Sequence, residues 1–171
     1  SRADRWNDPC RIDFDLDVLA PERAEAVGVN LNTDLNVSRE TLEKLALFVD
    51  LVRKWNPRIN LVSKHTLNVI WNRHVTDSIQ VFEMAPHVNS WVDLGSGGGF
   101  PGAIIGILKM QFRPNLRLNL VESDQRKCAF LRTVARELDL DYAVSASRIE
   151  EIEPLHVDIV SARALAELDT L

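Results

Sequence analysis

A cluster of glycines directly after a short apolar run is the stretch of this chain best suited to chemistry. The segment "WVDLGSGGGFPG", residues 91 to 102, holds five of the chain's seven glycines within eight positions. Glycine has no Cβ, so it permits positive φ angles and lets a ligand touch the backbone. A helix that begins just after such a loop directs free N–H groups to the same place. We therefore expect a nucleotide or nucleoside ligand here, with Gly95 and Gly97 among its contacts.

Two carboxylates narrow the choice of ligand. Glu122 ends a second apolar run, where a carboxylate can accept hydrogen bonds from both hydroxyls of a ribose. The alternative is an exposed acid in a loop. Asp93 lies two residues before the first glycine of the loop. It would repel a pyrophosphate but attract the sulfonium and ammonium groups of S-adenosylmethionine (SAM). SAM is therefore favoured over NAD, although an acid that binds loop amides would suit either ligand.

The apolar spacing predicts a helical region in the first half of the chain. Ser38 is a good N-cap for a helix that should end near Trp55, because Pro57 disfavours helical backbone at Asn56. A second helix is predicted over 67–84, with Ile70, Val75, Ile79 and Phe82 directed inward. A shorter helix is predicted over 17–28.

Strands and helices alternate from residue 89 onward. The predicted strands are 90–94, 116–122, 141–147 and 156–163, and helices follow the first, second and fourth of them. This order predicts an α/β fold with a mostly parallel sheet and helices on both faces. We divide the chain into an acidic tail with a short helix (1–36), a helical region (37–88) and a Rossmann-like domain (89–171). Four strands are few for such a sheet, so further C-terminal strands are expected to be missing.

Composition excludes several classes of protein. The two cysteines, Cys10 and Cys128, are far apart, and neither they nor the four histidines form a metal-binding motif, so we expect free thiols and no metal. No apolar stretch is long enough to span a bilayer, and the polar start of the chain lacks a signal-peptide core, so a cytoplasmic protein is expected. The net charge is −5, yet residues 51–76 carry five arginines and lysines and no acid. An acidic total can therefore hide a basic face.

Six ordered motifs identify a family resemblance. "WNPRINLVS", "RHVTDSI", "WVDLGSGGGFPG", "LVESDQRKCAFLR", "SRIEEI" and "DIVSARAL" occur in this order between about residues 35 and 171. Together they resemble the RsmG family, also called GidB (glucose-inhibited division protein B). The resemblance implies a class I SAM-dependent methyltransferase fold. It also implies bacterial methylation of guanine N7 in 16S ribosomal RNA (rRNA), in the 530 loop of the decoding centre, with S-adenosylhomocysteine as the product.

The resemblance also implies cofactor contacts by position. They fall on Gly95 and Phe100 in the glycine loop, on Ile149 and Glu150 in "SRIEEI", and on Arg163 in "SARA". Without the resemblance, Ile149 and Glu150 would be interpreted as a solvated turn and Arg163 as a solvated loop residue. Family members continue through further strands beyond this point, which is the second reason to expect missing strands.

No catalytic residue is expected for this reaction. Guanine N7 has a free lone pair at neutral pH, so methyl transfer by direct displacement needs alignment and exclusion of water but no general base. The expected partner is 16S rRNA or the small ribosomal subunit, and the chain is expected to be a monomer. The candidate RNA contacts lie in the acid-free segment: Arg53, Lys54, Arg58, Lys64, Arg73 and His74.

Three alternatives stay open beside these expectations. Trp55 and Trp71 interleave with the charges of the acid-free segment and could stack on RNA, but packing of their helices is the simpler interpretation. His74 and Asp77 share a helix face and either point to the cleft or fix the helix to the core. The whole chain could also be a class I methyltransferase for a small molecule or a protein, or a nucleotide-binding module without catalysis.

Overall fold

The computed structural model describes residues 33–152 and 156–163. The predicted helix over 17–28, the helix predicted after residue 163 and Cys10 lie outside these residues. The described elements follow one another along the chain in this order: α2 (Arg39–Ile59), α3 (Lys64–Leu67), η3 (Trp71–Val75), α4 (Thr76–Met84), β1 (Ser90–Leu94), α5 (Gly102–Phe112), β2 (Arg117–Glu122), α6 (Gln125–Glu137), β3 (Ala143–Ala146), η4 (Ile149–Glu151) and β4 (Ile159–Ala162).

The four strands form one parallel sheet in the order β3-β2-β1-β4. β1 pairs with β2 on one side and with β4 on the other, and β2 also pairs with β3. The strand order therefore reverses at β1. In open α/β sheets, ligands bind beyond the carboxyl ends of the strands at such a reversal. The glycine loop begins where β1 ends, so the fold places it at the expected binding position.

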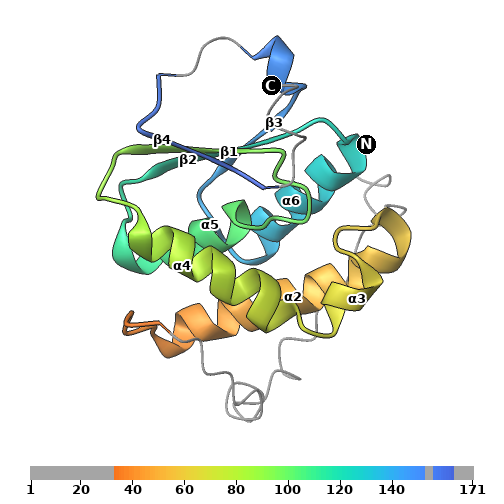
Figure 1. Cartoon of the computed structure of the whole chain (residues 1–171), viewed down its shortest axis with the longest axis horizontal. Helices are drawn as coiled ribbons and strands as arrows, with labels where there is room; N and C mark the ends of the chain where they lie inside the picture. Colours follow the sequence, from red (N-terminus) through yellow and green to blue (C-terminus); the bar gives the residue numbers. More distant parts are fainter. Residues whose placement is uncertain (1–32, 153–155, 164–171) are drawn as a thin grey trace, which may run out of the picture.

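The long helices gather on one side of the sheet (Figure 1). α5 lies over β2, α6 lies over β2 and β3, and α2 and α4 pack against them. Because β1→β2→β3 proceeds in one direction, right-handed crossovers put α5 and α6 on the same face. Helices were predicted on both faces. In the described part of the chain the connection from β3 to β4 holds only the short turn η4, and the helix predicted after β4 falls outside it.

A single apolar core joins the helical region to the α/β region. Phe48 of α2 lies with its ring centroid 5.1 Å from that of Phe100 in the glycine loop and 6.5 Å from that of Phe130 in α6. All three rings belong to one cluster of buried residues. The predicted division at residue 88 stays a prediction about domains, but the packing on either side of it is continuous.

The first helix begins as predicted and ends later than predicted. The Ser38 side chain accepts a hydrogen bond from the Thr41 N–H and caps α2. The helix continues through Pro57 to Ile59, so the predicted end near Trp55 is wrong. Buried Ile59 anchors the last turn in the core. The Asn56 side chain then accepts a hydrogen bond from the Val62 N–H at 2.8 Å. This bond holds the chain just beyond the helix and offsets the backbone hydrogen bond that Pro57, which has no N–H, cannot donate.

The second predicted helix is interrupted by one turn of π-helix. The predicted inward residues Ile70, Val75, Ile79 and Phe82 are all buried. Ile70 and Val75 are five positions apart, which exceeds the 3.6 residues of an α-helical turn. The wider turn η3 brings both side chains to the core. No helix in the described ranges is both long and apolar enough to cross a membrane.

Candidate functional site

A hollow of about 430 Å³ opens at the carboxyl edge of the sheet, among the loops that follow β1, β2 and β3. These loops meet because all the strands run in the same direction. Five of the eight residues predicted to contact a nucleoside ligand line its wall: Gly95, Gly97, Glu122, Ile149 and Glu150. The sheet thus brings together residues that are up to 55 positions apart along the chain.

Glu122 is fixed at the end of β2 by the backbone of two loops. Its Oε2 accepts a hydrogen bond from the Gly97 N–H and its Oε1 accepts one from the Asp124 N–H, both at 2.8 Å. A carboxylate oxygen has two lone pairs, so each oxygen keeps one for a ligand. The side chain is already oriented and needs no rearrangement to accept hydrogen bonds from two neighbouring hydroxyls.

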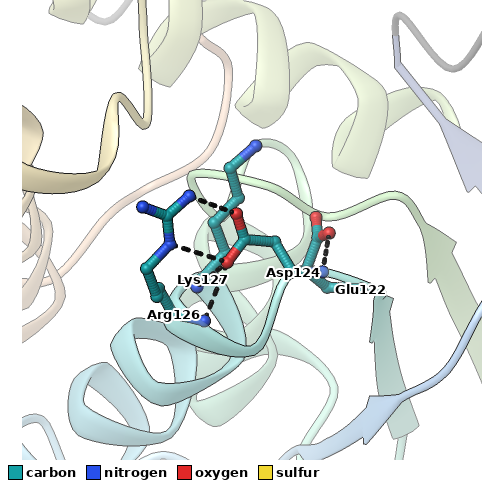
Figure 2. A network of polar contacts seen from close by, with 4 residues as sticks. All are labelled: Glu122, Asp124, Arg126 and Lys127. Carbon is teal, nitrogen blue, oxygen red and sulfur yellow. Dashed lines mark hydrogen bonds and ion pairs between the residues drawn. The ribbon is translucent and has the colours of Figure 1, made fainter.

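The turn after Glu122 is stabilised by its own charges (Figure 2). Asp124 caps α6 by accepting hydrogen bonds from the backbone N–H groups of Arg126 and Lys127. The Arg126 side chain also bonds Asp124, and these hydrogen bonds hold the pKa of Asp124 at about 2. The turn therefore keeps its geometry at any physiological pH, and Lys127 lies on the wall of the hollow.

The glycines of the loop serve two purposes. Gly97 has a φ of 53°, and a Cβ there would meet no atom closer than 3.6 Å. It faces the hollow with Gly95, whose φ is 65°. A Cβ on Gly98 would lie 2.9 Å from the Leu61 carbonyl oxygen, and one on Gly99 would lie 2.8 Å from the Ala103 Cβ. Close packing of the protein itself therefore accounts for Gly98 and Gly99.

Asp93 lies beneath the loop and outside the hollow. Its side chain is buried, and its Oδ1 accepts a hydrogen bond from the Ser161 hydroxyl at 2.7 Å. Its Oδ2 accepts one from the Gly102 N–H at 3.1 Å. Burial raises the pKa of Asp93, and the hydrogen bonds oppose that rise. The carboxylate thus joins β1, β4 and the start of α5, as in the alternative in which this acid binds loop amides.

Arg163, His74 and Phe100 form a second group, next to the glycine loop. The Arg163 Nη2 lies 2.7 Å from the His74 Nδ1. The guanidinium carbon is 5.6 Å from the centre of the Phe100 ring, and the His74 ring is 5.0 Å from it. The Phe100 ring itself faces the core. Neither residue lines the hollow itself, and Arg163 instead lines a neighbouring pocket with Trp91 and Pro101.

The acid-free segment borders both groups. Five of its six predicted RNA contacts are exposed: Arg53, Lys54, Arg58, Lys64 and Arg73. The sixth, His74, is half-buried beside Arg163. Leu61 lies against Gly98, so the connection from α2 to α3 touches the glycine loop directly. Trp55 and Trp71 are partly buried against the core, which favours the packing interpretation for both.

Comparison with known proteins gives the same assignment as the motifs. The family model GidB, described as rRNA small subunit methyltransferase G, matches residues 41–171. The chain belongs to this family.

Relatives of this methyltransferase G family support the assignment. The protein named ribosomal RNA small subunit methyltransferase G from Ruegeria pomeroyi is 59% identical over 137 residues, which cover 80% of this chain and 67% of the relative. The protein of the same name from Paramagnetospirillum magneticum is 49% identical, over 82% of this chain and 67% of its own length. The chain thus spans about two thirds of the length of these relatives.

Solved structures resemble the chain distantly. The tRNA (uracil-54, C5)-methyltransferase of Pyrococcus abyssi in complex with S-adenosyl-L-homocysteine is 14% identical, with a TM-score of 0.41. The match covers 56% of this chain and 21% of that one. The fold assignment rests on the sheet order and the family match.

Sequence reasoning about this family member missed Ser161 and the contact between His74 and Arg163. In the register of the sheet, Ser161 is paired with Asp93. Its role as the partner of Asp93 therefore follows only once β4 is known to lie beside β1. Among the described residues no three His, Cys, Asp or Glu side chains come together as a metal site would need. Cys128 is a buried free thiol.

The position of His74 in this methyltransferase predicts an acid-sensitive fold. Burial lowers the pKa of His74 to about 4, and the nearby charge of Arg163 adds to the effect. Between pH 6.5 and about 4 the unfolded chain therefore binds a proton at this site that the folded chain does not. The free energy of unfolding should fall as pH is lowered through this window.

Urea unfolding at several pH values between 7.5 and 4.5 measures this effect. A His74→Asn variant has no imidazole to titrate, so its free energy of unfolding should fall less steeply with pH than that of the wild type. Carboxylates titrate in both proteins and cancel in the comparison. Parallel pH dependences for the two proteins would contradict the lowered pKa.

Proposed function

We propose that this chain binds SAM in the hollow and transfers its methyl group to N7 of a guanine in 16S rRNA. The observation that carries the proposal is the contact between the acid-free segment and the glycine loop, through Leu61 and Gly98. It puts a basic surface next to a pocket with the features of a nucleoside site. Membership of the methyltransferase G family supports the same reaction.

The residues around the hollow fit the cofactor. Glu122 keeps two acceptor positions for the ribose hydroxyls, and Gly97, which has no side chain and lines the hollow, allows close approach to the backbone. Ile149 offers apolar cover and Glu150 a backbone edge for the adenine. Arg163 lies over Phe100 at the far end of the glycine loop, and we expect the amino-acid end of the cofactor to extend toward it. Asp93 adds negative charge from beneath the loop, which favours a cationic ligand.

The proposed reaction requires the protein to position the methyl donor and the guanine base. When bound, the cofactor supplies an activated methyl group. Guanine N7 provides its own lone pair, so the protein needs no base and its part is to align the reactants and exclude water. Glu122 and the glycine loop fix one end of the site and Arg163 the other. This division of labour explains why the two groups come from opposite sides of β1.

The RNA would lie along the exposed basic residues of the segment 51–76. Lysine and arginine side chains bind phosphates without regard to sequence, which places the strand while the pocket selects the base. The target base must be unstacked to enter a pocket of this kind. The location of this base in the 530 loop is what the family resemblance implies. Action in the cytoplasm and a monomeric state also belong to this proposal.

A methyl-transfer assay tests the proposed reaction. The chain is incubated with SAM labelled in its methyl group and with small-subunit rRNA, free or in the subunit. Label should enter the RNA, and borohydride–aniline cleavage, which is selective for 7-methylguanosine, should cut at one guanine. Label found only in small molecules or protein would support the alternative methyltransferase classes. Heat from NAD and none from SAM in calorimetry would favour the nucleotide-binding module.

Neutralising three exposed basic residues should weaken RNA binding and leave SAM binding unchanged. In a variant that combines Arg58→Gln, Lys64→Gln and Arg73→Gln, the slope of log affinity against log salt should fall by about 2, since single strands lose roughly 0.7 per phosphate contact. RNA affinity at low salt should fall at least about tenfold, and SAM affinity should not change. Filter binding across a salt series measures the slope.

A matched triple variant controls for net charge. Arg117, Arg132 and Arg136 are exposed and lie outside the acid-free segment. Their replacement by glutamine removes the same charge and should leave the slope nearly unchanged. Equal losses in both triple variants would mean that total charge, and not this surface, governs the RNA affinity.

A further inference from the structure

The contact between Arg163 and His74 fixes the protonation of the imidazole. A guanidinium has five N–H donors and no acceptor. With the Arg163 Nη2 at 2.7 Å, the His74 Nδ1 must accept the hydrogen bond. The ring proton is therefore on Nε2. That N–H is buried and has no hydrogen-bond partner in the described part of the chain.

A buried His74 Nε2–H without a partner destabilises the folded chain. A buried donor without a partner loses its hydrogen bonds to water on folding and gains none in exchange. The His74 backbone lies in the π turn η3, and its carbonyl accepts the Ser78 hydroxyl at 2.6 Å, which holds the turn in place. Turns of this kind occur often at functional sites, because one extra residue redirects the side chains. Here the turn directs the His74 imidazole at Arg163, which follows β4 at the carboxyl edge of the sheet.

We propose that His74 is a positioning residue that holds the Arg163 guanidinium at the cofactor site through an unprotonated Nδ1. The proposal rests on the proposed function, because it assigns His74 a task in the same pocket. It also moves His74 from the RNA-contacting set, where the sequence placed it, to the cofactor side.

A neutral acceptor suits this task better than a carboxylate. An acid in the place of His74 would fix the guanidinium but also neutralise it. The imidazole fixes it and leaves the positive charge available for the carboxylate of the cofactor's amino-acid end. The charged groups around His74 are Arg163, Asp77 and Arg73. Burial and the charge of Arg163 hold the pKa of His74 at about 4, so the ring stays neutral at physiological pH.

Two substitutions separate the hydrogen bond from the ring. His74→Asn keeps an acceptor near the Nδ1 position and loses the aromatic contact with Phe100. His74→Phe keeps the ring and loses the acceptor. Calorimetric titration with SAM should show affinity within about threefold of the wild type for H74N and at least about tenfold weaker for H74F. The reverse order would show that ring packing is what matters and would overturn the proposal.

His87 provides a control of the same residue type. It is exposed and precedes β1, at the opposite edge of the sheet from the glycine loop. His87→Phe should leave SAM affinity unchanged.

A double-mutant cycle tests whether His74 acts through Arg163. Arg163→Met removes the donor and keeps an apolar stem. If His74 only positions this arginine, H74F should cost at least about tenfold in the wild-type background and almost nothing in the R163M background. Additive losses would overturn the proposal, because they would mean that His74 acts on the cofactor by another route.

A measurement without cofactor keeps this inference separate from the proposed function. Nitrogen-15 shifts of the imidazole at pH 7 should show His74 Nδ1 unprotonated and Nε2 protonated in the wild type, and the pattern should change in R163M. A protonated Nδ1 would overturn the proposal. If the wild-type chain gave no SAM heat while Nδ1 was unprotonated, the SAM site would fall and the pairing of the two side chains would stand.

Discussion

Glu122→Ala is expected to weaken SAM binding by about 100-fold or more. The side chain offers one free acceptor position on each oxygen, and hydrogen bonds to a charged group contribute about 1.5–3 kcal/mol each. Loss of two such bonds corresponds to at least about 3 kcal/mol, or roughly 100-fold in the dissociation constant. The variant also removes the acceptor for the Gly97 and Asp124 amides, so the loop loses its fixed geometry. Calorimetric titration with SAM measures the effect.

Two further variants define the cause of the loss. Glu122→Gln keeps the shape and one acceptor oxygen, so its SAM affinity should lie between those of the wild type and the alanine variant. Glu137→Ala removes a carboxylate from the exposed end of α6 and should leave SAM affinity unchanged. SAM affinity within threefold of the wild type in Glu122→Ala would exclude a ribose contact at this residue.

Gly102→Ala is expected to lower the free energy of unfolding by roughly 2–3 kcal/mol, the upper range for overpacking. In an unconstrained helix the same change stabilises, because alanine has the higher helix propensity. Here a Cβ would lie 2.6 Å from the Asp93 Oδ2 and 2.8 Å from the Leu120 Cγ. Neither atom can move cheaply, since Asp93 is bonded to Ser161 and Leu120 is fully buried in β2. For a chain of this size the melting temperature should fall by about 5–10 °C.

Gly97→Ala is the matched control, because the same loop supplies it. A Cβ there would make only ordinary van der Waals contacts, at 3.6 Å from the Gly95 carbonyl oxygen and 3.9 Å from the Glu122 Oε2. The φ of 53° is strained for alanine, at a cost of about 1–2 kcal/mol. Gly97→Ala should therefore disturb SAM binding more than Gly102→Ala does, and thermal stability less. If both variants lost stability and binding in the same proportion, the division of the glycines into a ligand-facing and a packing set would be wrong.

The sequence predicted the sheet well because its signals are local. Each strand is a short apolar run next to a turn, and the order of strands and helices is enough to indicate parallel pairing. Two local rules failed where tertiary packing was stronger. Pro57 did not end α2, because Ile59 beyond it is buried in the core. The π turn at Trp71–Val75 was not foreseen, because a five-residue spacing between buried positions has no simple signature in the sequence.

The candidate site shows a similar limit. Gly97 and Glu122 could be paired from the sequence, because each follows a strand and the two strands are consecutive. The partners of Asp93 could not, since Ser161 comes from a strand that is adjacent only after the sheet has reversed its order. His74 was grouped with its basic neighbours in sequence. Its contact with Arg163 depends on the π turn and on β4 together, and neither can be read from residues 71–76 alone.

The hydrogen bonds on either side of β1 close loops of very different length. The Gly97–Glu122 bond spans 25 positions, whereas the bond between Asp93 and Ser161 spans 68. The entropy of loop closure makes the longer connection costlier by about 0.9 kcal/mol before any contact repays it. In a refolding chain we expect the hydrogen bond between Gly97 and Glu122 to form before β4 joins the sheet. Arg163, which directly follows β4, would then reach its place beside His74 later than Glu122 reaches Gly97.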